Sequence, residues 1–334
     1  MGGLTRYPAK ASEIPSSLDS REDAGLSMYQ TILVPVDGSD FSAHALPVAV
    51  ELARRTGATL HLALVHDPSA YIPFVPGEVA VPVYDAALVS TQREADQTRL
   101  TRAVASLKDS GIRIVSKFLE GTVVESLVEY GQQVAAELTV MTTHGRSGFA
   151  RLRLGSVASA YLTRATAPVL LVYGAGRQPE DSAPTLPSGT LLCALDGSAF
   201  SELILPHAAG FADACGMKMA LVSVVSPHAV GMAPFATEAL LADPAVLDQE
   251  EHDRLGYLER TAKSCPPGTT TRGVTDMSVS NAILEEAKRI GAGALAVATH
   301  GRGGFKRLML GSIADELIRH SVLPILVYRP DPSK

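Results

Sequence analysis

The chain has 334 residues, of which 46% are apolar and 19% are charged, a balance that suits a packed protein of about two domains. Its net charge of −6 argues against a broad basic face for nucleic acid, and no apolar stretch reaches the length of a transmembrane helix. The three cysteines cannot all pair with one another, which favours a reduced protein.

Residues 1–27 mix Pro, Ser and charged residues and contain no apolar run. We therefore expect a flexible tail there rather than a signal peptide. No spacing of Cys and His residues is typical of a zinc site, so no structural metal is expected. These features together predict a cytoplasmic protein that binds neither nucleic acid nor a membrane.

From residue 28 onward, short apolar runs alternate with helical patterns. The expected strands of the first half are 31–36, 59–65, 112–119, 138–141 and 168–173. The expected helices are one that is capped by Ser39 or Ser42 and stops at Gly57, two at 87–107 and 122–136, and one that opens on Ser156. Long loops are expected at 66–86 and, in the second half, at 226–249.

Strands that alternate with helices pair in parallel through right-handed crossovers, with helices on both faces of the sheet. In such sheets, ligands sit at the carboxyl ends of the strands, near the switch in strand order. Asp37 follows the first strand, and a glycine-bearing loop follows the fourth strand. If those two strands are neighbours, the carboxylate and the loop share one crevice.

The whole order of elements repeats after a stretch rich in Pro and Gly. Residues 144–158 and 300–314 are identical at 11 of 15 positions, which decides for duplication over coincidence. The sequence therefore predicts two tandem open, doubly wound, parallel five-stranded α/β sheets. The predicted parts are a tail at 1–27, domains at 28–174 and 189–330, and a linker at 175–188.

The glycine loop carries the clearest chemistry. It contains Gly145 and Gly155-Ser156 in the first half, and Gly301 and Gly311-Ser312 in the second. Glycines let a phosphate approach the backbone N–H groups at a helix start, and the serine adds a hydroxyl. The alternative is a turn that glycine permits, followed by an ordinary helix cap.

The strand-end aspartates and the charged loop residues also allow two interpretations. Asp37 and Asp196 either accept bonds from a ribose or an adenine-side group, or form Asx turns that close their strands. Arg146 and Arg302 either steer phosphates or are solvated. His144 is expected to stabilise its turn rather than to transfer a proton, because no carboxylate partner can be placed beside it.

Three stretches of the chain resemble the universal stress protein family. They are the strand that ends Val-Asp-Gly-Ser, the loop Thr-His-Gly-Arg-Ser-Gly…Leu-Gly-Ser, and the Pro-Val-Leu-Leu-Val strand that closes the domain. The resemblance covers about residues 28–174 and 189–330. It implies a Rossmann-like fold of the adenine nucleotide alpha hydrolase-like type. ATP-binding members carry G-x2-G-x9-G-[S/T], an Asp at the end of the first strand and a small apolar residue at the end of the second.

Carried onto this chain, that pattern implies one ATP site in each half, with Mg²⁺ brought in by the triphosphate. The first site would use Pro35, Asp37, Val65, Thr142, His144, Gly145, Arg146, Gly148, Gly155, Ser156 and Val157. The second would use Ala194, Asp196, Val224, Ala298, His300, Gly301, Arg302, Gly304, Gly311, Ser312 and Ile313.

The first glycine of the family pattern is replaced by Thr142 in the first half and by Ala298 in the second. Thr is β-branched and bulkier than Ala, so the first site is the one that this departure affects more. The resemblance also implies that the last strands, 169–173 and 325–328, pair with each other, and that two chains form a homodimer.

Three functions follow as alternatives. The first is an ATP-binding stress protein whose nucleotide occupancy regulates partner binding. The second is an interaction scaffold that needs no nucleotide. The third is a slow ATP hydrolase, against which the missing Walker sequence, general base and metal cluster count, so no catalytic residue is assigned.

Overall fold

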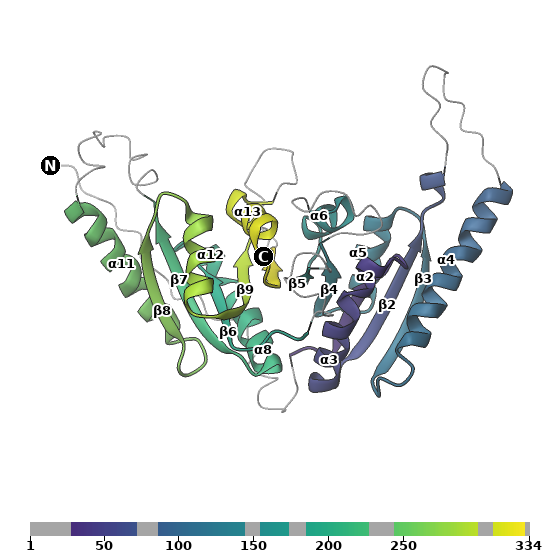
Figure 1. Ribbon diagram of the computed structural model, residues 1–334, viewed down its shortest axis with the longest axis horizontal. Coiled ribbons are helices and arrows are strands. Elements are labelled where there is room, and N and C mark those ends of the chain that lie inside the picture. The colour runs from purple at the N-terminus through teal and green to yellow at the C-terminus, as the bar shows by residue number, and fades with distance from the viewer. Residues whose placement is uncertain are drawn as a thin grey trace, which may run out of the picture.

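The structure is a computed structural model that describes residues 28–71, 86–143, 154–173, 185–226, 244–299 and 310–330. All of its described strands join into one ten-stranded sheet, in the order β3-β2-β1-β4-β5-β10-β9-β6-β7-β8. Figure 1 shows two similar halves side by side, with α4 and α11 on the outer flanks and α6 and α13 near the centre. The predicted tail at 1–27 lies outside the described residues, as does most of the predicted linker.

The first half follows the predicted alternation of strand and helix. Its strands are β1 (Thr31–Pro35), β2 (Thr59–His66), β3 (Arg113–Glu120), β4 (Leu138–Thr142) and β5 (Val169–Val172). Its helices are α2 (Asp40–Ala43), α3 (Ala45–Thr56), the 3₁₀ helix η1 (Pro68–Tyr71), α4 (Ala86–Ser106), α5 (Val123–Gln133) and α6 (Ser156–Leu162). The predicted first helix is therefore two helices, and Ser39 is the residue that caps the first of them.

The second half repeats this order. Its strands are β6 (Thr190–Ala194), β7 (Lys218–Val225), β8 (Thr270–Thr275), β9 (Ala292–Ala298) and β10 (Ile325–Tyr328). Its helices are α7 (Ala199–Glu202), α8 (Leu205–Cys215), α11 (Pro244–Ala262), α12 (Val279–Arg289) and α13 (Ser312–His320). The prediction of a loop through residue 249 was wrong at its end, because α11 begins at Pro244, where a proline suits the first turn of a helix.

Within each half all strands are parallel, as the alternation predicted. The two halves join where β5 and β10 pair antiparallel, with Leu170 opposite Leu326. This is the pairing of last strands that the family resemblance implied, and it occurs within one chain. The two predicted five-stranded sheets are thus the two halves of a single sheet.

Buried apolar side chains form one layer on each face of the sheet, and each layer runs across both halves. The first layer includes residues of α3 and α8, such as Leu52 and Phe211, which are fully buried. The second includes Tyr161 of α6 and Leu317 of α13. Because helices of both halves share each layer, the core is continuous across the β5–β10 pair.

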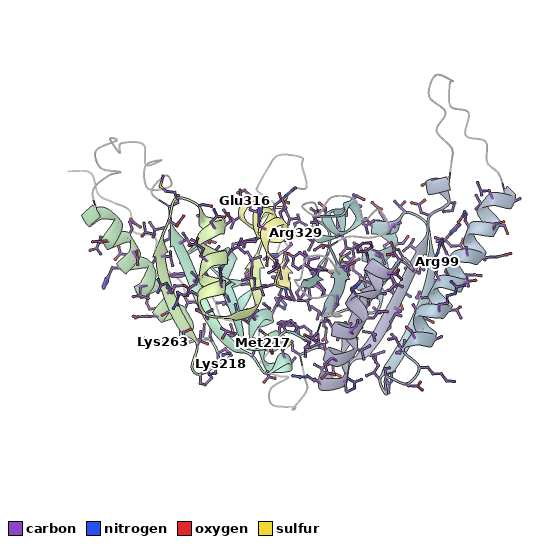
Figure 2. All side chains as sticks on the ribbon, viewed as in Figure 1. Arg99, Met217, Lys218, Lys263, Glu316 and Arg329 are labelled. Atoms are coloured by element: carbon purple, nitrogen blue, oxygen red, sulfur yellow. The ribbon has the colours of Figure 1, made fainter. Side chains whose placement is uncertain are left out.

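Polar contacts reinforce the join between the halves. The Tyr173 hydroxyl donates to the Ile318 carbonyl of α13 at 2.9 Å, and Tyr173 is only 2% exposed. In the reciprocal contact, the Arg329 guanidinium donates to the Thr163 carbonyl at the end of α6, and Figure 2 shows Arg329 at the centre of the molecule. Each half therefore holds the last turn of the helix that follows the other half's glycine loop.

Candidate functional site

The central strand of the first half ends in a turn that fixes the Asp37 carboxylate. Its Oδ1 accepts a bond from the Ser39 backbone N–H at 2.9 Å and another from the Ser39 hydroxyl at 2.6 Å. Gly38 lies between them with φ +75°, a left-handed conformation that favours glycine. Ser39 in turn caps α2 by accepting from the Ser42 N–H. The carboxylate is therefore held at the carboxyl end of β1.

The second half repeats the turn with the same bonds. Oδ1 of Asp196 accepts from the Ser198 N–H at 2.9 Å and from its hydroxyl at 2.5 Å. Both aspartates thus form the Asx turn that the sequence allowed as a structural role. An ionised carboxylate offers about four acceptor positions, so a turn of this kind is compatible with a ligand on the same group. Asp196 is exposed, whereas Asp37 is half-buried.

The strands that carry the aspartate and the glycine loop are neighbours, as the proposed crevice requires. β1 pairs with β4 in the first half and β6 pairs with β9 in the second. In the order β3-β2-β1-β4-β5, the next two strands along the chain, β2 and β3, lie on one side of β1. The chain then crosses over, and β4 and β5 lie on the other side. The gap between the ends of β1 and β4 is therefore the switch point at which open α/β sheets bind ligands.

The two ends of the glycine loop are joined at the end of β4. The Thr143 N–H donates to the Val172 carbonyl at 3.2 Å, and the Gly155 N–H donates to the Thr143 carbonyl at 2.7 Å. In the second half, the Gly311 N–H donates to the Thr299 hydroxyl oxygen at 3.0 Å. The base of each loop is thus closed beside the strand-end aspartate of its own half.

The tip of each loop lies outside the described residues. The predicted site residues that fall there are His144, Gly145, Arg146, Gly148, His300, Gly301, Arg302 and Gly304. Their role as phosphate contacts stays a prediction.

The last glycine of each loop caps the helix that follows. Gly155 has φ −59° and ψ 150°, and Gly311 has φ −60° and ψ 145°. Every residue type adopts this conformation, so the backbone does not require glycine at either place. Neither helix receives a hydrogen bond from a cap side chain, and Ser156 and Ser312 are exposed in its first turn. The backbone conformation therefore does not explain why these two positions are glycine.

A buried bond fixes α6 against the sheet. The Thr139 hydroxyl of β4 and the Tyr161 hydroxyl of α6 lie 3.0 Å apart. Burial raises the pKa of the Tyr161 phenol, so the group stays neutral and its hydrogen bond persists at ordinary pH. The start of α6, with Gly155 and Ser156, is therefore held in a constant position relative to β4.

The remaining predicted residues lie at the strand ends or in the first turn of the loop helices. Pro35 and Ala194 end β1 and β6, Val65 and Val224 are the penultimate residues of β2 and β7, and Val157 and Ile313 are the second residues of α6 and α13. Thr142 and Ala298, the replacements of the first family glycine, end β4 and β9. Thr142 is 7% exposed, whereas Ala298 is half-buried.

The sequence interpretation missed three polar side chains beside the first site, two of which are buried. His66 Nδ1 lies 3.0 Å from Asp96 Oδ2, with side chains that are 1% and 2% exposed. Arg99 forms an ion pair with the other oxygen of Asp96. Both Asp96 and Arg99 belong to α4, whose sequence was interpreted only as a charged helix.

Within the described ranges, no three His, Cys, Asp or Glu side chains gather closely enough to bind a metal ion. None of the helices in the described part of the chain combines the length and apolar character needed to cross a bilayer. The fold and its two strand-end turns define an α/β protein with a potential ligand site at each of two switch points.

Comparisons with known proteins agree with this class. Residues 28–173 and 188–329 each match the universal stress protein family model. A universal stress protein of Mycolicibacterium smegmatis is 30% identical over 307 residues, which cover 90% of this chain and 97% of that protein. Another, from Methanocaldococcus jannaschii, is 32% identical over 148 residues, covering 44% of this chain and 84% of that protein.

A solved structure supports the same fold. The crystal structure of a universal stress protein from Archaeoglobus fulgidus is similar with a TM-score of 0.59 at 18% identity, covering 91% of this chain and 99% of that one. The chain belongs to the universal stress protein family, as a tandem of two family domains.

Proposed function

We propose that this protein binds ATP, accompanied by Mg²⁺, at two sites and that nucleotide occupancy regulates its interactions in a stress response. Each nucleotide would lie between a strand-end aspartate, Asp37 or Asp196, and the glycine loop that follows the neighbouring strand. The observation that carries the proposal is the juxtaposition of these two features at the switch point of each half.

The glycines at the helix starts support binding over a purely structural loop. The backbone angles at Gly155 and Gly311 suit any residue, and the proposal attributes the absence of a side chain there to the space needed in front of the helix. A phosphate that contacts backbone N–H groups needs such space. Mg²⁺ would neutralise part of the triphosphate charge, and the exposed hydroxyls of Ser156 and Ser312 would face the same region.

The second candidate is an interaction scaffold without nucleotide. The Asx turns favour it, because Asp37 and Asp196 already have a structural role in closing their strands. The two candidates differ in whether purified protein carries or accepts an adenine nucleotide. We therefore design the test around binding rather than around activity.

The protein is purified, denatured and assayed for released adenine nucleotide, and its thermal unfolding is measured with ATP and Mg²⁺. A ligand at a hundred times its Kd stabilises the folded state by about 2.7 kcal/mol per site. Protein that releases no nucleotide and shows no thermal shift would refute the proposal and leave the scaffold.

Substitution of the helix-start glycines assigns the two sites. Gly155→Val and Gly311→Val each place a side chain where the phosphates would approach, so each should remove one of two binding events in calorimetry. The cost to stability should stay within about 1 kcal/mol, because the change affects only a helix cap. A double variant that still binds two nucleotides would show that the loop has been wrongly assigned.

A further inference from the structure

Three polar side chains beside the first site form a connected set, which we name the His66–Asp96–Arg99 cluster. His66 is the last residue of β2 and directly follows Val65, a predicted residue of the first ATP site. Its imidazole reaches Asp96 of α4 at 3.0 Å, and Asp96 also pairs with Arg99. The Asp96 side chain is 2% exposed, so the loss of its ion pair with Arg99 is more costly than the loss of an exposed ion pair.

Arg99 extends the cluster to the end of β1. A Cβ built on Gly38 would lie 2.6 Å from Cβ and Cδ of Arg99, so the aliphatic stem of the arginine covers this glycine closely. Gly38 follows Asp37, the predicted ribose or adenine-side contact. Figure 2 shows Arg99 on α4, at the outer side of the first half. One cluster therefore touches the strand ends that hold both Asp37 and Val65.

The end of β3 is bound to the same helix. The rings of His66 and Phe118 stack with centroids 6.3 Å apart and planes 17° from parallel. The Arg93 guanidinium of α4 lies 5.5 Å from the centre of the Phe118 ring and pairs with Glu120 at 2.6 Å. The helix is thus attached to the ends of β1, β2 and β3, with His66 at the centre.

The described residues of the second half build the corresponding region differently. Val225 ends β7 where His66 ends β2. Glu251 of α11 accepts a bond from the Thr275 hydroxyl of β8 at 2.8 Å, instead of pairing with a residue of β7. Arg254 lies over Gly197 with its guanidinium, whereas Arg99 covers Gly38 with its aliphatic stem, and Arg254 donates to the Asp196 carbonyl at 2.5 Å.

We propose that the His66–Asp96–Arg99 cluster positions the ends of β1 and β2 for nucleotide in the first site, through a partly buried ionic contact that has no counterpart among the described residues of the second site. The inference rests on the proposed nucleotide binding. His66, Asp96 and Arg99 act as positioning residues, because they hold Asp37 and Val65 rather than contact the ligand. If the cluster is broken, the ends of β1 and β2 adopt the arrangement that binds nucleotide for a smaller fraction of the time. The affinity of the first site for nucleotide then falls in proportion.

The test reads the two sites separately. The Gly311→Val chain retains the first site, and the Gly155→Val chain retains the second. Asp96→Asn, which keeps the shape and removes the charge, should weaken ATP–Mg²⁺ binding of the first site by about tenfold, as expected if the competent fraction falls to about a tenth. Calorimetry is run well below the melting temperature, with circular dichroism to show that the chain is folded.

The matched control is Glu251→Gln in the Gly155→Val chain. Glutamine keeps a carbonyl oxygen for the Thr275 hydroxyl, so second-site affinity should change by less than about twofold. The inference is overturned if Asp96→Asn leaves the affinity of the first site within about twofold of that of the Gly311→Val chain. The inference is also overturned if the Gly311→Val chain binds no nucleotide while the Gly155→Val chain does. The proposed function then stands at one site. If neither chain binds nucleotide, both proposals fail.

A second pair of variants covers the case in which Asp96→Asn does not fold. The Arg99 side chain is 32% exposed, so substitutions there are tolerated more easily. Arg99→Met keeps an aliphatic stem over Gly38 and should weaken first-site binding by about fivefold, whereas Arg99→Lys restores a cation beside Asp96 and should recover most of that loss. Equal affinities for the Met and Lys variants would show that only packing matters and would overturn the inference.

Discussion

The two halves should unfold as one cooperative unit, and a substitution far from their join tests this. Leu221 lies in β7 and is 1% exposed, and two strands, β6 and β9, separate β7 from β10. Leu221→Ala should lower the free energy of unfolding by about 2.7–5 kcal/mol, the cost of truncating a leucine in a packed core. We expect this substitution to destabilise the first half by the same amount.

The reason lies in the join itself. Leu170 and Leu326 are fully buried opposite each other in β5 and β10. The Tyr173 hydroxyl bonds across the join, and the Tyr29 hydroxyl donates to the His207 carbonyl at 3.1 Å. If one half unfolded alone, it would expose this shared apolar surface and leave buried polar groups without partners. Partial unfolding is therefore costly compared with unfolding of the whole chain.

Hydrogen exchange measured by mass spectrometry separates the halves by peptide. A loss of 2.7 kcal/mol corresponds to about a hundredfold faster exchange of amides that open only by global unfolding. In Leu221→Ala, the slowest amides of β1 and β2 should accelerate as much as those of β6 and β7. The control is Leu203→Ala, at a leucine that is 42% exposed, which should change neither half measurably. Acceleration confined to the second half would refute the idea of one cooperative unit.

Two further predictions concern stability. Gly38→Ala should lower the free energy of unfolding in urea more than Gly57→Ala does. Both glycines have a positive φ, which costs a residue with a Cβ about 1–2 kcal/mol. Only at Gly38 does the new Cβ also meet Arg99. Burial lowers the pKa of His207 from 6.5 to about 4, so the unfolded chain binds a proton that the folded chain excludes, and stability should fall as pH drops from about 6.5 towards 4. His207→Phe, which keeps a ring against Tyr328, should remove that part of the pH dependence, and an unchanged pH profile would contradict it.

The alternation of apolar runs and helical patterns was enough to predict the fold, because inner strands such as β1 and β4 are buried on both faces and read as apolar runs, while the edge strand β3 alternates. The break between α2 and α3 was not predictable, since His44 keeps a helical conformation there and the apolar pattern continues through it. The start of α11 had a signal, Pro244, that the prediction of a long loop passed over.

The site was predictable to the extent that parallel topology dictates it. Once β1 and β4 are neighbours, Asp37 and the glycine loop must meet at one edge of the sheet. The His66–Asp96 contact joins residues 30 positions apart through the packing of α4 on β2, and no local period encodes such a contact. The comparison of the halves held a clue, because an arginine of the outer helix covers the strand-end glycine in both.

The pairing of β5 with β10 within one chain also constrains the predicted homodimer. In the described part of the sheet, the remaining edges are β3 and β8, since every other strand has two neighbours. These edges carry exposed Arg113 and Lys117 on β3 and exposed Arg272 on β8. Charged side chains on edge strands oppose the addition of another strand. We therefore expect a homodimer of this protein not to form by strand addition at these two edges, and sedimentation that shows a dimer dissociated by neutralising these edge charges would contradict that expectation.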